Sequence, residues 1–212
     1  MWSAFANSGQ VCIRTERVLV DRRVADEFIA RVVAAASALR PGPGTADGEF
    51  DIGPSVRAAH LDYLERLISD AVAGGANVAL AGGRTGHLGP LFFSPTILTG
   101  CTPDMAVMRD EVFGPVLPIM TFDTEDDAVK TANNPPGGLS GSVCSRDVRR
   151  ARDIARRLNA GSVCLNDALV NYLCVEAPLG GAGSSGLGFR HGSEALRQFC
   201  RTETILEDAR RR

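Results

Sequence analysis

The spacing of hydrophobic residues changes repeatedly along the first half of the chain, which predicts alternating strands and helices. Apolar residues recur at helical spacing from Val24 to Leu39 and again from Val56 to about Ala73. The pair Gly74-Gly75 follows the second segment and is typical of a helix C-cap. Short apolar runs predict strands at residues 17–20, 77–81, 92–98 and 116–122.

The second half of the chain continues this alternation. Asp123 or Thr124 is a candidate N-cap for a helix that runs to Ala132, and the Asn-, Pro- and Gly-rich segment 133–138 ends that helix. The pattern then predicts a strand at 139–144, a helix at 147–158 and a strand at 162–165. Such an order is typical of an α/β fold in which helices cover a largely parallel sheet.

Two prolines affect the predicted strands. Pro95 crosses the segment 92–98, and Pro118 lies within the segment 116–122. Because proline has no N–H to donate to a neighbouring strand, Pro118 predicts that its strand lies at a sheet edge or contains a bulge.

Composition and charge narrow the class of protein. Hydrophobic residues make up 44 % of the 212 residues and charged residues 23 %, which is ordinary for a soluble globular chain. Lysine and arginine number 23 against 25 aspartates and glutamates, so the net charge of −2 offers no basic excess for nucleic acid. No segment approaches the roughly 20 apolar residues of a membrane span, and no signal peptide is recognisable. We therefore expect a cytoplasmic protein that binds neither nucleic acid nor membrane.

The cysteines and histidines do not follow a metal-binding or disulfide pattern. The six cysteines never approach C-x-x-C spacing, and the three histidines are scattered, so no metal site is expected. Cys12 follows the small polar loop 7–10, where backbone N–H groups can stabilise a thiolate or an oxyanion. On this context alone, Cys12 is either a nucleophile or a small buried hydrophobic residue.

Longer segments are similar to those of one enzyme family. Residues 5–20, F-A-N-S-G-Q-V-C-I-R-T-E-R-V-L-V, resemble the nucleophile motif of the aldehyde dehydrogenase superfamily. Later segments resemble further motifs of that family in the same order: D-E-V-F-G-P-V at 110–116, A-N-N through G-L-S at 132–140, and L-N-A-G-S-V to N at 158–166. The resemblance covers residues 2–206.

This resemblance implies both a fold and an activity. The fold is a three-layer α/β/α catalytic domain with a largely parallel sheet over residues 1–201, lacking most of the Rossmann-type cofactor domain. A terminal oligomerisation strand and tail follow at 202–212, with Thr202 to Leu206 as the pairing strand. The activity is oxidation of an aldehyde to a carboxylic acid with NAD or NADP, and the partners are further copies of the chain or a separately encoded N-terminal half.

Three residues match the functional positions of the family motifs. Cys12 corresponds to the nucleophile that forms a thiohemiacetal and then a thioester, Glu111 to the carboxylate that holds the nicotinamide ribose, and Phe113 to the aromatic residue beside the nicotinamide ring. Residues two apart on an extended segment face the same way, so Glu111 and Phe113 can contact one ligand together.

The resemblance also implies that functional parts of the family lie outside this sequence. Complete members carry a general base and a second oxyanion donor before the nucleophile loop. Loss of a base costs about 10²–10⁴ in rate and loss of one oxyanion donor about 10²–10³, so the isolated chain is expected to be nearly inactive. Two alternatives therefore remain: a catalytically incompetent fragment that binds full-length relatives, and a thiol esterase that uses Cys12 without a cofactor.

A glycine-rich motif near the C-terminus has a different explanation. Residues Gly181 to Gly186 match G-x-G-x-x-G, but no strand leads directly into them and no β-α-β unit follows, so a dinucleotide-binding fingerprint is rejected. The surrounding segment 178–188 resembles the P-F-G-G loop of the family, with Leu179 in place of the usual Phe. His191 follows at the start of a predicted helix and is expected to be structural.

Overall fold

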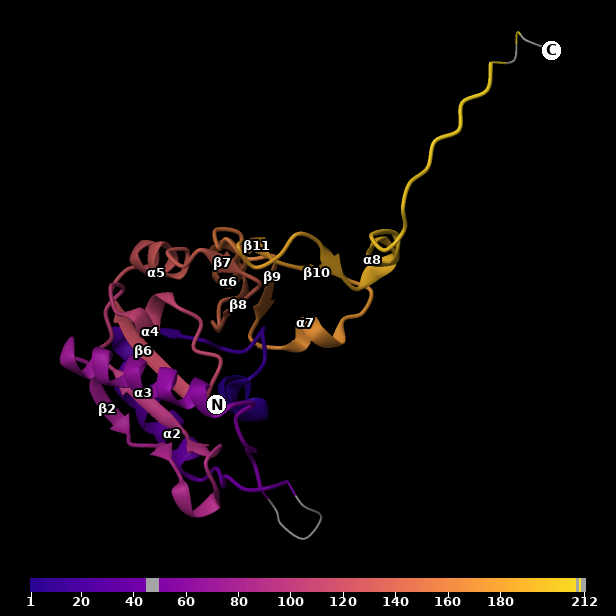
Figure 1. The fold of residues 1–212 in the computed structure, drawn as a ribbon. Coiled ribbons are helices and arrows are strands. Elements are labelled where there is room, and N and C mark those ends of the chain that lie inside the picture. The colour runs from indigo at the N-terminus through magenta and orange to yellow at the C-terminus, as the bar shows by residue number, and fades with distance from the viewer. Residues whose placement is uncertain (45–49, 209, 211–212) are drawn as a thin grey trace.

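A four-stranded sheet with its helices forms the lower left part of the molecule in Figure 1. The computed structural model describes residues 1–44, 50–208 and 210. The strand order is β1 (Val18–Asp21), β6 (Val116–Phe122), β5 (Thr96–Thr99) and β2 (Asn77–Leu80). The β1–β6 and β5–β6 pairs are parallel and the β2–β5 pair is antiparallel, so the sheet is mixed.

Helices cover both faces of this sheet. Side chains alternate between faces along a strand, so neighbouring residues contact different helices. Ile97 packs into the hydrophobic cluster of α2 (Ala25–Ser37), and Leu98 packs into the cluster of α3 (Ala58–Ala73). The α/β fold with helices on either side of the sheet is therefore confirmed.

The prediction from Pro118 was wrong. Strand β6 pairs with β1 on one side and β5 on the other, so it is central, and Pro118 lies opposite Leu98. Pro118 is fully buried, between the buried residues Leu117 and Ile119. Burial of this apolar run outweighs the one ladder hydrogen bond that proline cannot donate.

The strand expected at 92–98 is divided where Pro95 crosses it. Its first part is β4 (Phe93–Ser94), which pairs with β3 (Gly83–Arg84) outside the main sheet. Its second part is β5 of the main sheet. Pro95 therefore redirects the chain from one ladder to another.

The predicted β-α-β unit is present above the sheet in Figure 1. Strands β8 (Ser140–Val143) and β9 (Ser162–Leu165) pair in parallel, and α6 (Val148–Ala155) connects them. Helix α5 (Glu125–Ala132) begins after Thr124, whose side chain accepts a hydrogen bond from Asp127 N. Of the two candidate caps, Thr124 is the correct one.

Short elements complete the described chain. Two further antiparallel ladders join β7 (Gly137–Gly138) to β11 (Ala182–Gly183) and β10 (Leu179–Gly180) to β12 (Phe189–Arg190). The short helices are α1 (Trp2–Phe5), α4 (Ala106–Arg109), α7 (Val170–Leu173) and α8 (Gly192–Arg197), with 3₁₀ turns at Ala6–Gly9, Arg22–Val24 and Gly86–Leu88. Segment 181–186 holds β11 and a turn, and no helix begins within it, consistent with rejection of the dinucleotide fingerprint.

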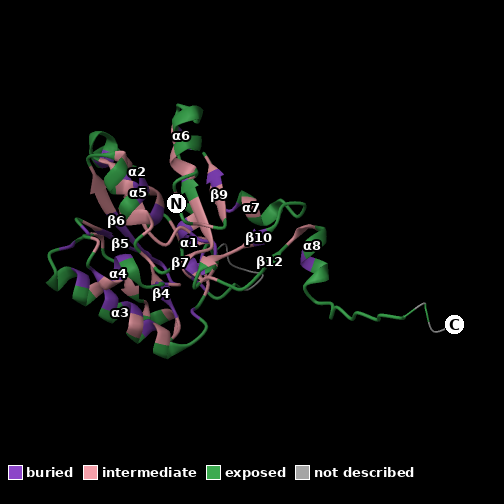
Figure 2. Ribbon diagram, turned by 90° about the horizontal axis from the view of Figure 1, so that it is seen from above, coloured by how far each residue is buried: buried purple, intermediate pink, exposed green. Residues whose placement is uncertain are grey.

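The C-terminal segment extends away from the rest of the molecule and is exposed (Figures 1 and 2). Residues 201–208 form neither helix nor strand in the single chain, so the expected pairing strand 202–206 has no ladder here. The end of the predicted tail at 209 and 211–212 lies outside the described residues, as does part of the predicted loop at 45–49. The proposed boundary between 201 and 202 remains a prediction.

The buried thiol of Cys101 makes stability depend on alkaline pH. Burial raises the pKa of Cys101 to about 11, above the roughly 8.5–9 of an exposed thiol. Between these values the unfolded chain loses the proton and the folded chain keeps it, so stability falls as pH rises. We expect the free energy of unfolding to fall by about 2 kcal/mol from pH 9 to pH 11, measured by urea unfolding. The Cys101→Ala variant should lose this component and the exposed-site control Cys200→Ala should keep it; equal pH profiles for all three would contradict the prediction.

Candidate active site

The turn before Cys12 has an unusual backbone that brings it against the segment before β6. Asn7, Ser8 and Gly9 have φ of 50°, 57° and 72°, so three successive residues adopt the left-handed conformation. A Cβ on Gly9 would lie 2.3 Å from the carbonyl oxygen of Gly114, which excludes any side chain at this position. Glycine is therefore needed here both for its backbone angle and for the close approach to Gly114.

Side chains of the turn fix it to a second loop. Ser8 Oγ donates to the Gly53 carbonyl at 2.7 Å, and Gln10 Nε2 donates to the Pro54 carbonyl at 3.1 Å. Gln10 Oε1 also accepts from Val56 N at 2.8 Å. Because both ends of the Gln10 amide are used, the chain entering Cys12 is held in one orientation.

Cys12 is exposed, while the residues on either side of it face an apolar cavity. The cavity has a volume of about 360 Å³ and is lined by Val11 and Ile13 from the nucleophile segment. Its other lining residues come from α1 and the turn after it, and from the segment that follows β9: Trp2, Ala6, Asp167, Ala168, Leu169, Val170, Tyr172 and Leu173. Both chain neighbours of Cys12 thus line a space large enough for a small apolar molecule.

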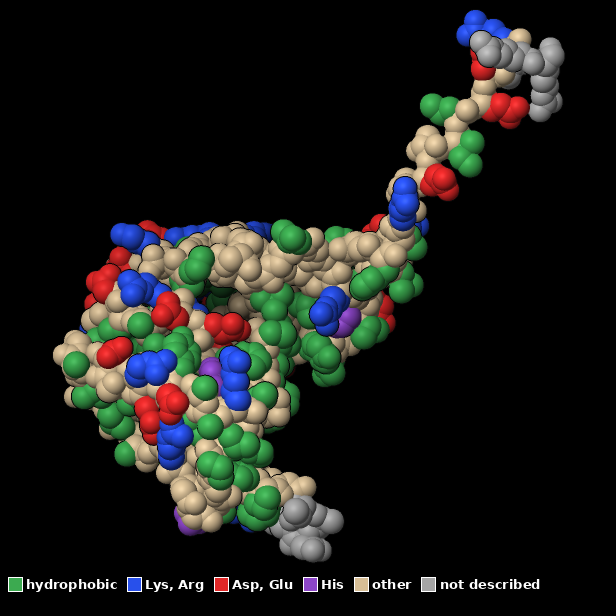
Figure 3. Space-filling view, in the orientation of Figure 1, with side chains coloured by type: hydrophobic (Ala, Val, Ile, Leu, Met, Phe, Trp, Pro, Cys, Tyr) green, Lys and Arg blue, Asp and Glu red, His purple; other side chains and the backbone are tan. Residues whose placement is uncertain are grey.

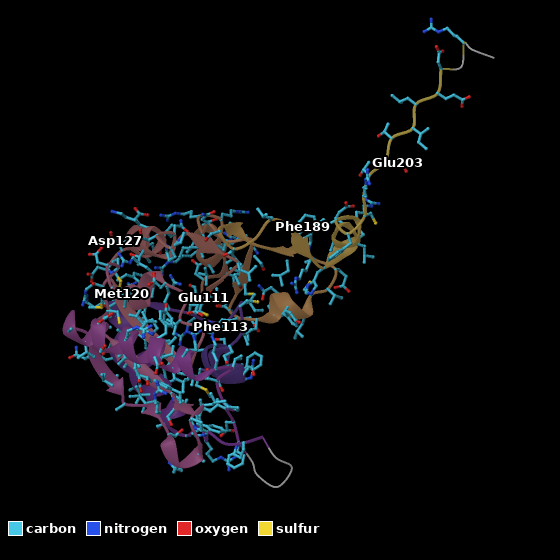
Figure 4. All side chains as sticks on the ribbon, in the orientation of Figure 1. Glu111, Phe113, Met120, Asp127, Phe189 and Glu203 are labelled. Atoms are coloured by element: carbon cyan, nitrogen blue, oxygen red, sulfur yellow. The ribbon has the colours of Figure 1, made fainter. Side chains whose placement is uncertain are left out.

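The segment from Glu111 to Gly114 reaches the nucleophile turn through the close approach of Gly114 to Gly9. Val112 is fully buried, Glu111 is exposed, and Phe113 is half-buried with a φ of 47°. Figure 4 shows Glu111 and Phe113 at the middle of the molecule. A positive φ at a bulky residue such as Phe113 is strained and persists only where the surroundings hold it.

Hydrogen bonds from two directions hold this segment. From α3, His60 Nε2 donates to the Phe113 carbonyl at 2.9 Å and the Tyr63 hydroxyl donates to the Glu111 carbonyl at 3.1 Å. From the nucleophile segment, the Glu16 carboxylate accepts from Val112 N at 2.9 Å and from Phe113 N at 3.2 Å. Burial, together with the nearby Asp110, raises the pKa of Tyr63, so its hydroxyl remains a donor at neutral pH.

The predicted site residues therefore come from two segments that are joined at Gly9 and Gly114. Cys12 lies three residues from one side of this contact, and Glu111 and Phe113 lie just before the other. The roles given to the three residues remain predictions. The sequence analysis did not identify the residues that hold the segment from Glu111 to Gly114. The available signal was the spacing of His60 and Tyr63, which are three apart on a helix and therefore share a face.

Within residues 1–44, 50–208 and 210, no three His, Cys, Asp or Glu side chains are grouped so that they could hold an ion. Over the same residues, no helix is long and apolar enough to cross a membrane. Charged side chains of both signs are interspersed on the face shown in Figure 3.

Native alkylation tests the exposure of Cys12. Cys12, Cys144, Cys174 and Cys200 are exposed, whereas Cys101 and Cys164 are buried. Treatment with iodoacetamide at pH 8 should modify the four exposed thiols and spare both buried ones, and Cys101 is further protected because its pKa is about 11. Peptide mass spectrometry reads the result, and urea-unfolded protein is the control in which all six should react. Protection of Cys12 in the folded chain would contradict the exposed site.

Comparison with known proteins places this site in a family. The model of the aldehyde dehydrogenase family matches residues 1–205. The chain is 35 % identical over 204 residues to a putative succinate-semialdehyde dehydrogenase [NADP(+)] 2 of Mycobacterium tuberculosis, which covers 96 % of this chain and 39 % of that protein. It is 38 % identical over 207 residues to 2-hydroxymuconic semialdehyde dehydrogenase of Pseudomonas putida, covering 96 % of this chain and 42 % of that protein.

Solved structures give the same result. Lactaldehyde dehydrogenase from Escherichia coli matches with a TM-score of 0.88 and 32 % identity, covering 96 % of this chain and 42 % of that one. Betaine aldehyde dehydrogenase from Staphylococcus aureus, solved in complex with NAD⁺, matches with a TM-score of 0.85 and 34 % identity, covering 93 % and 39 % of the two chains. The chain spans about two fifths of the length of these relatives. The match over residues 1–205 and the shared fold show that this chain belongs to the aldehyde dehydrogenase family.

Proposed function

We propose that this chain is the nucleophile-bearing part of an NAD(P)-dependent enzyme that oxidises an aldehyde to a carboxylic acid. The observation that carries the proposal is the position of the exposed Cys12. It lies between Val11 and Ile13, which line an apolar cavity, and the Gly9–Gly114 contact joins its segment to that of Glu111 and Phe113. Such an arrangement brings a segment that carries a nucleophile and a segment that can hold a second ligand into one region of the molecule.

The covalent step belongs to Cys12. Its thiolate adds to the aldehyde carbon, and the oxygen of the resulting thiohemiacetal is stabilised by the backbone N–H of Cys12. Loss of a hydride converts the thiohemiacetal to a thioester. Water then attacks the thioester carbon, which releases the carboxylic acid and a proton and restores the thiolate.

The segment of Glu111 and Phe113 fits the nicotinamide half of a dinucleotide. Glu111 presents an exposed carboxylate that can accept from ribose hydroxyls, and the half-buried Phe113 offers a ring face to a planar group. The dinucleotide supplies the oxidising group that accepts the hydride. In this proposal the chain's own residues orient that group and carry the substrate, and the choice between NAD and NADP stays open.

The cavity favours an aldehyde with an apolar body. Asp167 is the one charged residue among the described lining residues, and no lysine or arginine lines the space. A carboxylate-bearing aldehyde would meet Asp167 without a cation to offset the repulsion. We therefore propose aliphatic aldehydes such as hexanal as the substrate class.

Trapping of the acyl group on Cys12 tests this proposal even if turnover is slow. The chain is mixed with hexanal and NAD⁺ or NADP⁺, quenched in acid and digested, and the Cys12 peptide is weighed by mass spectrometry. We expect a hexanoyl thioester on Cys12 together with an equal amount of reduced dinucleotide, measured by fluorescence. The Cys12→Ser variant should form neither product, and the control variant Cys144→Ser should form both.

Two outcomes would contradict the proposal. An acyl group that appears on Cys12 only from a nitrophenyl ester, and never from an aldehyde with dinucleotide, would favour the thiol esterase. Absence of any adduct at Cys12 in a folded chain would favour a catalytically incompetent binding fragment.

We further propose that the C-terminal segment pairs with another copy of the chain. The apolar residues of this end are exposed instead of packed in the core: Leu196 at 74 %, Phe199 at 88 %, Ile205 at 84 % and Leu206 at 90 %. Figure 3 shows hydrophobic side chains along this extension. Exposed apolar residues on a segment without its own ladder are typical of a strand that is completed by association.

Charge substitution in the segment tests the association. The chain should self-associate in light scattering at micromolar concentration, and the double substitution Ile205→Glu with Leu206→Glu should weaken association by about tenfold or more, because burying each side chain contributes about 1.5–3 kcal/mol. Glu203→Gln is the matched control in the same segment and should associate like the unmodified chain. A monomeric unmodified chain would overturn the proposal.

A further inference from the structure

A buried ion pair next to the nucleophile has no part in the chemistry proposed above. Arg14 follows Cys12 by two residues, and its side chain is only 1 % exposed. Arg14 Nε and one terminal nitrogen donate to the two Glu16 carboxylate oxygens at 2.7 and 3.1 Å. The remaining donors bind carbonyls of Ala4 at 2.9 Å, Gly114 at 2.6 Å and Val116 at 3.0 Å.

All five guanidinium donors of Arg14 are therefore used, and three of the bonds leave the pair for the backbone. Two of these carbonyls, those of Gly114 and Val116, lie about a hundred residues away in sequence. A lysine could supply charge here but could not match this planar set of bonds. Arg14 thus joins the nucleophile segment to the start of β6.

Glu16 extends the same link to the residues in front of β6. Each of its two carboxylate oxygens receives one bond from Arg14 and one from a backbone amide, those of Val112 and Phe113. Only an ionised carboxylate accepts four such bonds, because a protonated or amide group would present a donor to one of these N–H groups. The two amides lie between Glu111 and Gly114, where Phe113 holds its strained φ of 47°.

We propose that Glu16, oriented by Arg14, is the positioning residue for the dinucleotide side of the site. By binding the amides of Val112 and Phe113, it fixes the backbone from which the Phe113 ring and the Glu111 carboxylate project. The inference rests on the proposed function, since it assigns that segment to the nicotinamide ligand. Among the described residues, the bonds of the Glu16 carboxylate come from Arg14, Val112 and Phe113 and none comes from Cys12, so the effect of Glu16 falls on the ligand and not on the thiol.

The substitution Glu16→Gln tests this inference with little change in size. The Gln side chain places an NH₂ group where one oxygen accepts from both a backbone amide and the guanidinium, so the bonds to Val112 and Phe113 cannot both remain. We expect hydrogen exchange of the 110–114 segment to become about tenfold faster or more, while exchange in β1 changes by less than about twofold. The dissociation constant for NAD(P)⁺ should rise by about tenfold or more, whereas the rate of Cys12 alkylation without dinucleotide should stay within about twofold.

Two further variants complete the experiment. Glu16→Asp keeps the charge, so it should recover part of the NAD(P)⁺ affinity, and it replaces Glu16→Gln if that variant does not fold. Asp123→Asn is the matched control, because it removes the exposed ion pair between Arg22 and Asp123 at 2.5 Å, at the opposite end of β6 from the site. It should change neither hydrogen exchange at 110–114 nor the affinity for NAD(P)⁺.

The results distinguish failure of the positioning role of Glu16 from failure of the proposed function. Unchanged exchange at 110–114 in Glu16→Gln, or equal losses of dinucleotide affinity and Cys12 reactivity, would overturn the positioning role and leave a merely structural ion pair. If the unmodified chain binds no NAD(P)⁺ at saturating concentration, the proposed function fails for this chain and the ligand role of Glu16 falls with it, even where exchange shows that Glu16 holds the segment.

Discussion

The ion pair of Arg14 and Glu16 is the link that makes one site from two distant parts of the chain. It binds the start of β6 and the amides in front of it to the segment that carries Cys12. A buried guanidinium left without its carboxylate would cost about 3–5 kcal/mol, so the two residues are required together. The close approach of Gly9 to Gly114 depends on the same geometry, because Arg14 binds the Gly114 carbonyl.

This link also explains how strained backbone is maintained on both sides of the site. Asn7, Ser8 and Phe113 adopt positive φ angles that cost about 1–3 kcal/mol each where nothing compensates. Gln10 donates to the Asn7 carbonyl, Ser8 donates to the Gly53 carbonyl, and Phe113 is bonded to Glu16 and to His60 of α3. The four-stranded sheet with its two helical layers supplies the rigid support. The exposed thiol of Cys12 and the exposed carboxylate of Glu111 thus belong to backbone segments that hydrogen bonds hold in place.

Periodicity and cap residues predicted most of the fold because these signals are local. The helix 58–73 and the β8-α6-β9 unit follow from them, and one of the two candidate caps, Thr124, caps its helix. The prediction from Pro118 was wrong because the rule considers only the missing N–H donor and takes no account of burial between two neighbouring strands. The motifs identified the candidate residues, but the backbone amides that Glu16 binds lie nearly a hundred residues away, and no local pattern reveals them.

A crystal structure of this chain soaked with NAD(P)⁺ tests the central claim most directly. We expect the nicotinamide ring against Phe113, a ribose hydroxyl within about 3 Å of the Glu111 carboxylate, and the Cys12 sulfur facing the same ring. A dinucleotide bound away from residues 111–113, or a Cys12 sulfur turned away from that segment, would contradict it.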